Sequence, residues 1–182
     1  MREGIIKLIK ENVSNEKLVK HMIAVGSIMR KIAEKLGKDA EKWELVGLLH
    51  DIDYEKTKEN PKLHGIEAEK IVGNILDEEA IHAIKAHNFE NTGIQPETEL
   101  DYALIAADQI SGLIVATALV MPSKKLEEVK VKSIINSFKD KSFARGCKRE
   151  LILYCEKIGI ERDEFFELAL NAMKEISEKL GL

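Results

Sequence analysis

Apolar residues recur about every 3.6 positions along nearly the whole chain, and no segment shows the strict apolar–polar alternation of a half-buried strand. This spacing predicts an all-α protein of about eight or nine helices with no significant sheet. The chain shows no internal repeat and no low-complexity linker, so we expect a single domain over residues 1–182. A length of 182 residues lets such a domain bury a sizeable core.

Capping residues, glycines and prolines set the expected helix boundaries. Ser14 is predicted to cap a helix that runs to about Leu36, and Asp39 is predicted to cap the next helix, which ends near His50. The other helices are expected over residues 3–12, 61–75, 77–90, 98–121, 131–138, 143–158 and 165–180.

The most apolar stretch, Leu100 to Met121, is long enough to raise the question of a transmembrane helix. It carries Asp101, Asp108 and Ser111, and such polar groups disfavour a spanning helix. We therefore expect a buried central helix and no membrane association.

Charge and cysteine usage narrow the class of protein further. The chain has 28 basic and 32 acidic residues and a net charge of −4, so it gives no strong nucleic-acid signal, although a local basic patch remains compatible with it. Cys147 and Cys155 lie in a predicted helix with their Cα atoms about 12 Å apart, too far for a disulfide. Reduced thiols and the absence of a signal-peptide pattern predict a cytoplasmic protein. The sequence does not distinguish a monomer from a homodimer.

Histidine and aspartate occur on the apolar faces of several predicted helices. His21 lies about 40° from Val25 on a helical wheel, within an apolar stripe. His50 ends an apolar run and is followed directly by Asp51, and Asp108 faces the core side of the long apolar helix. Burying such groups unpaired costs several kcal/mol, and a shared metal ion would remove that cost. We therefore predict that these four residues converge on a metal.

Helical phase separates the remaining histidines. His82 and His87 are five residues apart and point about 140° away from each other, so both cannot bind one centre. His87 is in register with Ala80 and Ala83 and is taken as a candidate ligand, whereas His82 is interpreted as a surface residue. His64 lies in the first turn of a predicted helix, where a metal role is favoured and simple exposure stays open. Imidazole and carboxylate ligands suit Fe, Mn, Co, Ni or Zn better than Ca or Mg, which predicts a divalent transition metal.

The ordered set His21, His50-Asp51 and Asp108 resembles the pattern of the HD superfamily of metal-dependent phosphohydrolases. The segment Leu48–Asp53 is similar to the signature of that superfamily. Lys62–Gly65 and Ile84–His87 resemble the extra histidine motifs of its two-metal branches. The resemblance implies an HD-domain-like orthogonal helical globule, with a metal-binding core over residues 18–120 or so and a C-terminal helical extension over residues 123–182 or so.

The same resemblance implies that metal-activated water hydrolyses a phosphate mono- or diester, with a nucleotide or another small phosphorylated molecule as the expected substrate. One ion would be held by His21, His50, Asp51 and Asp108. Asp51 would bridge to a second ion held by His64 and His87.

Asp53 is our candidate for a general acid/base or for a residue that supports the ligands, and helix capping explains it equally well. Basic residues should face the substrate phosphate. The candidates are Lys56, Lys85, Arg145 and Lys148. Arg145 and Lys148 would lie on one side of a predicted helix, although a solvated helix face explains this spacing too.

The sequence departs from the patterns of this superfamily at two places that affect the expected substrate specificity. Tyr54 stands where several two-metal phosphodiesterases of the superfamily carry a lysine, and Lys56 is displaced from that position by two residues. The glycine-rich motif of cyclic-dinucleotide phosphodiesterases is also missing after His87, so we do not expect that specificity. A non-catalytic metal or nucleotide sensor and a di-iron oxygenase remain alternative hypotheses.

Overall fold

Helices make up the regular structure of the chain. The structure is a computed structural model that describes residues 2–182, with side chains described from Gly4 onward. No strand occurs in this range, and the expected all-α class is confirmed. The α-helices are α1 (Arg2–Asn12), α2 (Glu16–Leu36), α3 (Ala40–Leu49), α4 (Tyr54–Thr57), α5 (Ala68–Val72), α6 (Glu78–His87), α7 (Phe89–Thr92), α8 (Glu99–Leu119), α9 (Val131–Lys139), α10 (Arg149–Ile152), α11 (Arg162–Lys174) and α12 (Ser177–Leu180). Short 3-10 helices cover η1 (Pro61–Leu63), η2 (Leu126–Glu128) and η3 (Leu153–Ile158).

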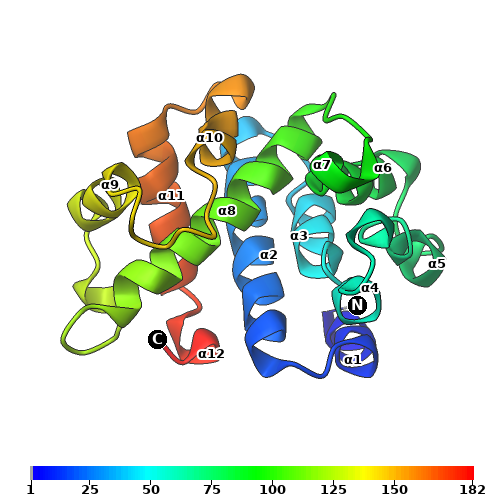
Figure 1. Cartoon of the computed structure of the whole chain (residues 1–182), viewed down its shortest axis with the longest axis horizontal. Helices are drawn as coiled ribbons and strands as arrows, with labels where there is room; N and C mark the ends of the chain where they lie inside the picture. The colour runs from blue at the N-terminus through cyan, green and yellow to red at the C-terminus, as the bar shows by residue number, and fades with distance from the viewer. Residues whose placement is uncertain (1) are drawn as a thin grey trace.

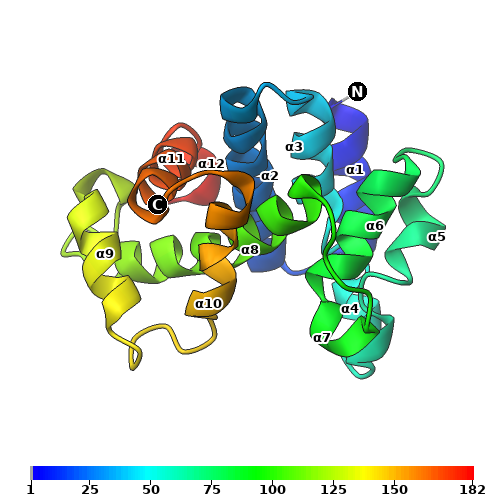
Figure 2. The ribbon, with the colours of Figure 1, turned by 90° about the horizontal axis from the view of Figure 1, so that it is seen from above.

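Two helices of 21 residues each, α2 and α8, form the centre of the fold. They cross each other, with α3 beside α2 and α6 against one end of α8 (Figure 1). Seen from above, α9, α11 and α12 lie on one side of the crossing and α4 to α7 on the other (Figure 2). Buried apolar side chains form one continuous cluster that reaches from Ile5 in α1 to Leu180 in α12.

Two glycines let α2 and α3 pack backbone to backbone. A Cβ on Gly47 would lie 2.8 Å from the Cα of Gly26, which is closer than a real Cβ atom can approach. Because α3 lies so close to α2, the residue at its C-terminal end, His50, comes near His21. Their ring centroids are 5.2 Å apart.

The helix α2 begins with a different cap from the one expected. Asn15, not Ser14, is the N-cap, and its side-chain oxygen accepts a hydrogen bond from the backbone N–H of Lys17. Ser14 instead donates from its backbone N–H and its hydroxyl to the carboxylate of Glu55. The start of α2 is therefore tied to α4.

The single helix predicted over residues 61–75 is wrong. The 3-10 turn η1 ends before His64, whose backbone is extended, and α5 begins only at Ala68. Gly65 explains the break, because its φ is +87° and a Cβ there would lie 2.7 Å from the carbonyl oxygen of Ile84. The chain leaves helical geometry at this point and passes close to α6.

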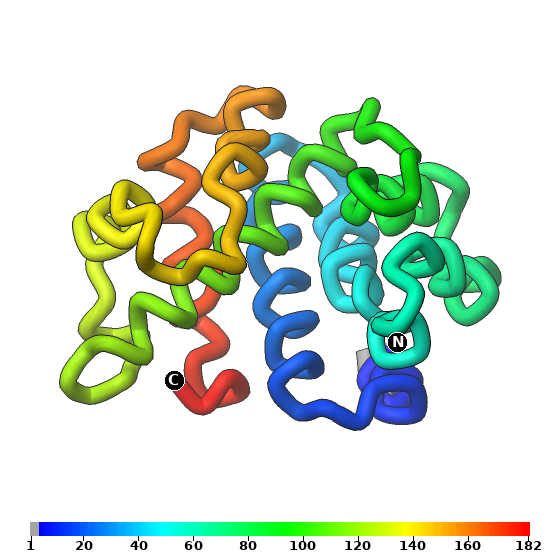
Figure 3. Tube along the Cα trace, viewed as in Figure 1, coloured from blue at the N-terminus to red at the C-terminus, as the bar shows by residue number. Residues whose placement is uncertain are grey.

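The single helix predicted over residues 143–158 is also wrong. Residues 140–148 form a loop, and regular structure resumes only in α10 and η3. The guanidinium of Arg149 donates to the carbonyl oxygens of Phe143, Ala144 and Cys147, which a helix would use in its own ladder. Figure 3 shows the trace of this loop as it leaves α9 and runs across α8 to α10. The last predicted helix is likewise divided, into α11 and α12.

The helix α8 is long and apolar enough to cross a membrane by length and composition alone. Within the fold, 61% of its most apolar window is buried. Its first turn is closed by a capping box in which Thr98 and Asp101 exchange hydrogen bonds. This is the environment expected of a central core helix.

Candidate metal centre

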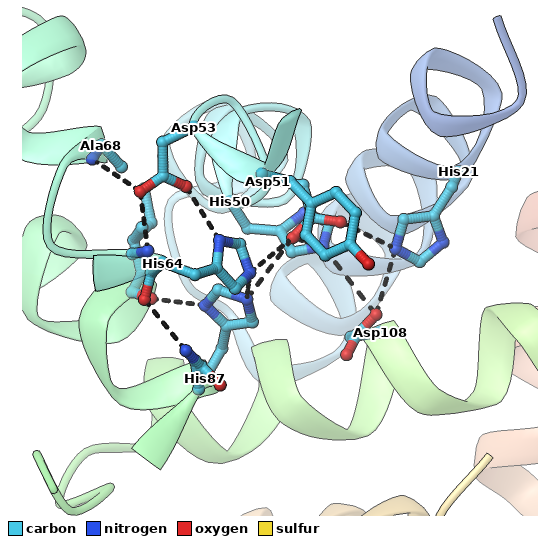
Figure 4. A network of polar contacts seen from close by, with 12 residues as sticks. His21, His50, Asp51, Asp53, His64, Ala68, His87 and Asp108 are labelled. Atoms are coloured by element: carbon cyan, nitrogen blue, oxygen red, sulfur yellow. Dashed lines mark hydrogen bonds and ion pairs between the residues drawn. The ribbon is translucent and has the colours of Figure 1, made fainter. Parts of the chain in front are cut away.

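Six of the predicted site residues meet at one point between the helices. His21 comes from the second turn of α2 and Asp108 from the middle of α8, while His50 and Asp51 follow the end of α3. His64 lies just after η1, and His87 is the last residue of α6. Figure 4 shows the imidazoles turned toward the carboxylate of Asp51. The structure thus brings the predicted residues together, and their role as ligands stays a prediction.

The carboxylate of Asp51 lies at the centre of the cluster. Its Oδ1 is 3.4 Å from Nε2 of His50, 3.2 Å from Nε2 of His64 and 3.5 Å from Nε2 of His87. Its Oδ2 is 3.6 Å from Nε2 of His21. Asp51 therefore belongs to two groups of donor atoms close enough to hold a metal ion, one with His21 and His50 and one with His64 and His87.

Asp108 closes the first of these groups from the side of α8. Its Oδ1 lies 3.1 Å from Nε2 of His21 and 3.8 Å from Nε2 of His50. Ser111, one turn further along α8, donates its hydroxyl to the carbonyl oxygen of Asp108, and its Oγ lies 3.1 Å from Nδ1 of His21. The Nδ1–H of His21 can therefore donate to Oγ, which leaves Nε2 directed toward the carboxylates.

The other three imidazoles are held from behind in the same way. Nδ1 of His50 lies 2.8 Å from the carbonyl oxygen of Gly47, and Nδ1 of His87 contacts the carbonyl oxygen of Ile84. Nδ1 of His64 lies 2.9 Å from Oδ1 of Asp53. A carbonyl oxygen only accepts, so His50 and His87 carry their proton on Nδ1 and present the Nε2 lone pair to the cluster. Metal-binding histidines are oriented in this way.

Two features of the histidine Nε2 atoms that face Asp51 fit a bound cation. Nε2 of His50 is buried and has no hydrogen-bond partner among the described residues, and leaving such an atom unsatisfied is costly. Nε2 of His64 and Nε2 of His87 are 3.0 Å apart. Two nitrogens about 2.1 Å from one ion lie about 3.0 Å apart at adjacent positions of an octahedron and about 3.4 Å apart in a tetrahedron. The cluster of imidazoles and carboxylates could therefore hold a divalent metal.

The pKa values of His50 and His64 are shifted in opposite directions, that of His50 downward by burial and that of His64 upward by neighbouring carboxylates. Burial lowers the pKa of His50 to about 4, which keeps this imidazole neutral near pH 7. Burial also opposes the charged form of His64, but hydrogen bonds and charge from Asp51 and Asp53 outweigh it and raise its pKa to about 9. Without an ion, His64 therefore holds a proton that a metal would have to displace.

The two central carboxylates stay ionised. Burial favours their neutral form, yet the surrounding histidines lower the pKa of Asp51 well below its ordinary value. The pKa of Asp108 is lowered mainly by its hydrogen bond and charge interaction with His21. Carboxylates held ionised in a buried site are suited to binding a cation.

Asp53 occupies a supporting position. It is fully buried, with Oδ1 toward His64 and with Oδ2 accepting from the backbone N–H groups of Gly65 and Ala68. The imidazole of His64 stands between this carboxylate and that of Asp51 (Figure 4). Of the roles suggested by the sequence, this geometry favours orientation of His64 over proton transfer to a substrate.

His82 lies outside the cluster, as helical phase predicts. Its Nδ1 is 3.1 Å from Oδ2 of Asp101 at the start of α8. Its neighbour on the same helix, His87, is the one that reaches Asp51.

A cleft of about 990 Å³ opens over the cluster, with Asp51, His64, His87 and Asp108 in its wall. The half-exposed ring of Tyr54 also lines the cleft and meets His64 edge-on, at a centroid distance of 5.2 Å. The cleft is therefore open to a ligand directly above the candidate metal ligands.

The predicted basic residues divide between the cleft and other surfaces. Lys148 lines the cleft and pairs with Glu90. Lys56 instead donates to Asn12, and Lys85 pairs with Glu69 outside the cleft. The expectation that Arg145 and Lys148 share a helix face is wrong, because residues 141–148 form no helix, and Arg145 is exposed and outside the cleft lining.

Two other lysines line the cleft and were not predicted. Lys17 lies one helical turn before His21 in α2, and this spacing is a signal that could have identified it. Lys58 follows the short helix α4, where no regular spacing could have pointed to it.

Comparison with known proteins places these residues in a family pattern. The family model of the HD domain matches residues 18–113. Ribonuclease Y of Lawsonia intracellularis is 29% identical over 171 residues, which are 91% of this chain and 32% of that protein. Ribonuclease Y of Thermoanaerobacter pseudethanolicus is 30% identical over 171 residues, again 91% of this chain and 33% of that protein. The chain thus spans about a third of the length of these relatives. No solved structure matches it significantly.

Proposed function

This chain belongs to the HD domain family, and we propose that it is a metal-dependent phosphohydrolase that cleaves phosphodiester bonds in RNA. The observation that carries the proposal is the position of Asp51 at the wall of an open cleft, where its carboxylate belongs to two groups of candidate metal donors, one with His21 and His50 and one with His64 and His87.

The residues that would hold metal follow from these two groups. His21, His50, Asp51 and Asp108 would hold one ion, and Asp51, His64 and His87 would hold a second. A divalent ion of the Fe, Mn, Co, Ni or Zn type, when bound, lowers the pKa of water and stabilises negative charge on phosphoryl oxygens.

The walls of the cleft provide groups that can bind the rest of a nucleic-acid strand. Lys17 and Lys58 line the same cleft as the candidate ligands, and lysines bind phosphate as point charges. The exposed ring of Tyr54 offers a face on which a base can stack. Only these cleft residues would contact the phosphate backbone. The proposal therefore does not require an overall basic chain, and the net charge is −4.

Two observations favour RNA over a small phosphate ester. The relatives that match 91% of the chain carry the name Ribonuclease Y. The cleft, at about 990 Å³, lies at the upper end of the range of about 300–1,000 Å³ for small-molecule sites. A cleft of this size has room for more than one nucleotide.

The test is hydrolysis by the purified protein, loaded separately with Mn²⁺, Co²⁺ and Ni²⁺. The substrates are a short single-stranded RNA, the DNA of the same sequence, a generic phosphodiester and a set of nucleoside monophosphates. We expect cleavage of the RNA in preference to the monophosphates, and its loss in Asp51→Asn purified in parallel, which controls for contaminating nucleases. Preference for the monophosphates would contradict the RNA assignment, and no hydrolysis of any substrate would contradict the phosphohydrolase assignment.

A further inference from the structure

A chain of hydrogen bonds links the candidate ligand Asp108 to the loop of residues 140–148. Gln109 donates from Nε2 to Oδ2 of Asp108 at 2.8 Å, and its Oε1 accepts from the backbone N–H of Lys148 at 2.9 Å. The partners fix the orientation of the amide, since a carboxylate accepts and a backbone N–H donates. We propose that Gln109 is a positioning residue that couples this loop to the metal centre.

The loop is stiffened by Arg149, the residue that follows Lys148. Its guanidinium donates to six backbone carbonyls, those of Ser137, Phe138, Asp140, Phe143, Ala144 and Cys147. A guanidinium has five N–H donors, so this network engages it fully and leaves no free donor for a phosphate. Because these carbonyls span the whole loop, a displacement at one point is transmitted to the others.

The loop also forms part of the cleft. Gly146 and Lys148 line the cleft together with Gln109, and the side chain of Lys148 pairs with Glu90, another lining residue. A ligand in the cleft would therefore touch the loop and Gln109 at the same time.

The other end of the link sets the direction of Asp108. Gln109 holds Oδ2 of this carboxylate, while Oδ1 faces His21 at 3.1 Å. Movement of the loop would pull on Gln109 and turn Asp108 relative to His21. Coupling of this kind is reciprocal, so an ion that fixes Asp108 should also order the loop. The inference rests on the proposed function in one respect, namely that the cluster binds a metal.

The test compares Co²⁺ binding by the wild type, Gln109→Leu and Gln95→Leu. Leucine has nearly the size of glutamine but makes neither hydrogen bond. Gln95 is exposed and far from Asp108 in the sequence, so the same substitution there is a matched control. Calorimetric titration gives the dissociation constant, the visible spectrum of bound Co²⁺ reports the coordination geometry, and amide hydrogen exchange reports order in the loop.

We expect Co²⁺ to slow exchange in the loop of the wild type and of Gln95→Leu. In Gln109→Leu we expect Co²⁺ to bind about 10–100-fold more weakly, the usual effect of losing a residue that supports a metal ligand. Its Co²⁺ spectrum should change, and added Co²⁺ should no longer slow exchange in the loop.

A second pair of variants tests the hydrogen bond between Gln109 and the loop from the loop side. Lys148→Pro removes the backbone N–H while keeping Gln109, and the φ of −79° at this position suits proline. Lys148→Ala keeps the N–H and removes only the side chain. We expect Co²⁺-dependent protection of the loop to be lost in Lys148→Pro and kept in Lys148→Ala.

The outcomes separate this inference from the proposed function. A wild type that binds Co²⁺, with equal affinity and equal loop protection in Gln109→Leu, would overturn the coupling and leave the metal centre in place. If Gln109→Leu fails to fold, the test rests on Lys148→Pro. Co²⁺-dependent protection of the loop in Lys148→Pro equal to that of the wild type would then overturn the coupling. A wild type that binds no Co²⁺, Mn²⁺ or Ni²⁺ would overturn both proposals.

Discussion

Asp53 holds His64 from behind, with Oδ1 2.9 Å from Nδ1 of the imidazole, while Nε2 of the same ring lies 3.2 Å from Oδ1 of Asp51. The other oxygen of Asp53 is anchored by the N–H groups of Gly65 and Ala68. The orientation of His64 is therefore fixed by the fold itself. A bound ion would not need to reorganise this ring.

Asp53→Asn should weaken metal binding at the group formed by Asp51, His64 and His87. The asparagine oxygen is required by the two backbone N–H groups, so its NH₂ would face Nδ1 of His64 and move the imidazole proton to Nε2. A protonated Nε2 cannot bind a metal, and we expect about 10–100-fold weaker binding of the second ion. Calorimetric titration with Mn²⁺ measures this, with Asp163→Asn on the exposed face of α11 as control. Unchanged binding of the second ion would show that Asp53 does not orient His64.

His87→Ala should remove one metal ion per chain, whereas His82→Ala should remove none. Both histidines are on α6, so the two substitutions place the same change on one helix, and only His87 faces Asp51. Elemental analysis of protein loaded with Mn²⁺ or Co²⁺ gives the stoichiometry. Equal metal content in wild type and His87→Ala would contradict a second metal ion at Asp51, His64 and His87. Only the site formed by His21, His50, Asp51 and Asp108 would then remain.

Helical phase explains which parts of this site the sequence could predict. His21, His87 and Asp108 lie in regular helices longer than two turns, where the direction of a side chain follows from its position. His82 could be set aside for the same reason. The all-α class follows from the same period, because the apolar stripes are long.

The predictions that failed concern segments of the chain outside regular helices. The helix expected around Arg145 is a loop, because Arg149 binds the carbonyls that a helix would use. A side-chain network of this kind leaves no periodic trace in the sequence. The position of Asp53 likewise depends on a turn whose geometry is set by contacts with Gly65 and Ala68, distant in the chain.

Gly47→Ala should destabilise the protein, although it replaces glycine by a better helix former. The new Cβ would lie 2.8 Å from backbone atoms of Gly26, so α3 would have to move away from α2. Overpacking of this kind typically costs about 1–3 kcal/mol. Urea unfolding measures the change, and Gly4→Ala in α1 is the control, because a Cβ there meets no atom within 4 Å. We expect Gly4→Ala to be neutral or stabilising by up to about 1 kcal/mol, and a neutral Gly47→Ala would contradict the close packing of the two helices.

The metal-free protein should lose stability as the pH rises from about 6.5 to about 9. The pKa of His64 is raised from 6.5 to about 9 by Asp51 and Asp53. A group whose pKa is higher in the folded state contributes its full stabilisation below the unfolded value and loses it as the pH passes the folded value. The contribution of His64 is at most about 3 kcal/mol on this basis.

Urea unfolding in the presence of a chelator, at intervals across this pH range, measures the loss. His64→Gln should flatten most of the slope. A smaller part should remain, because the pKa of His21 is also raised, by Asp108 and Asp51 against the effect of burial. Metal affinity should change in the opposite direction and increase with pH up to about 9, since an ion must displace the proton of His64. An equal slope in His64→Gln and wild type would place the titrating group elsewhere.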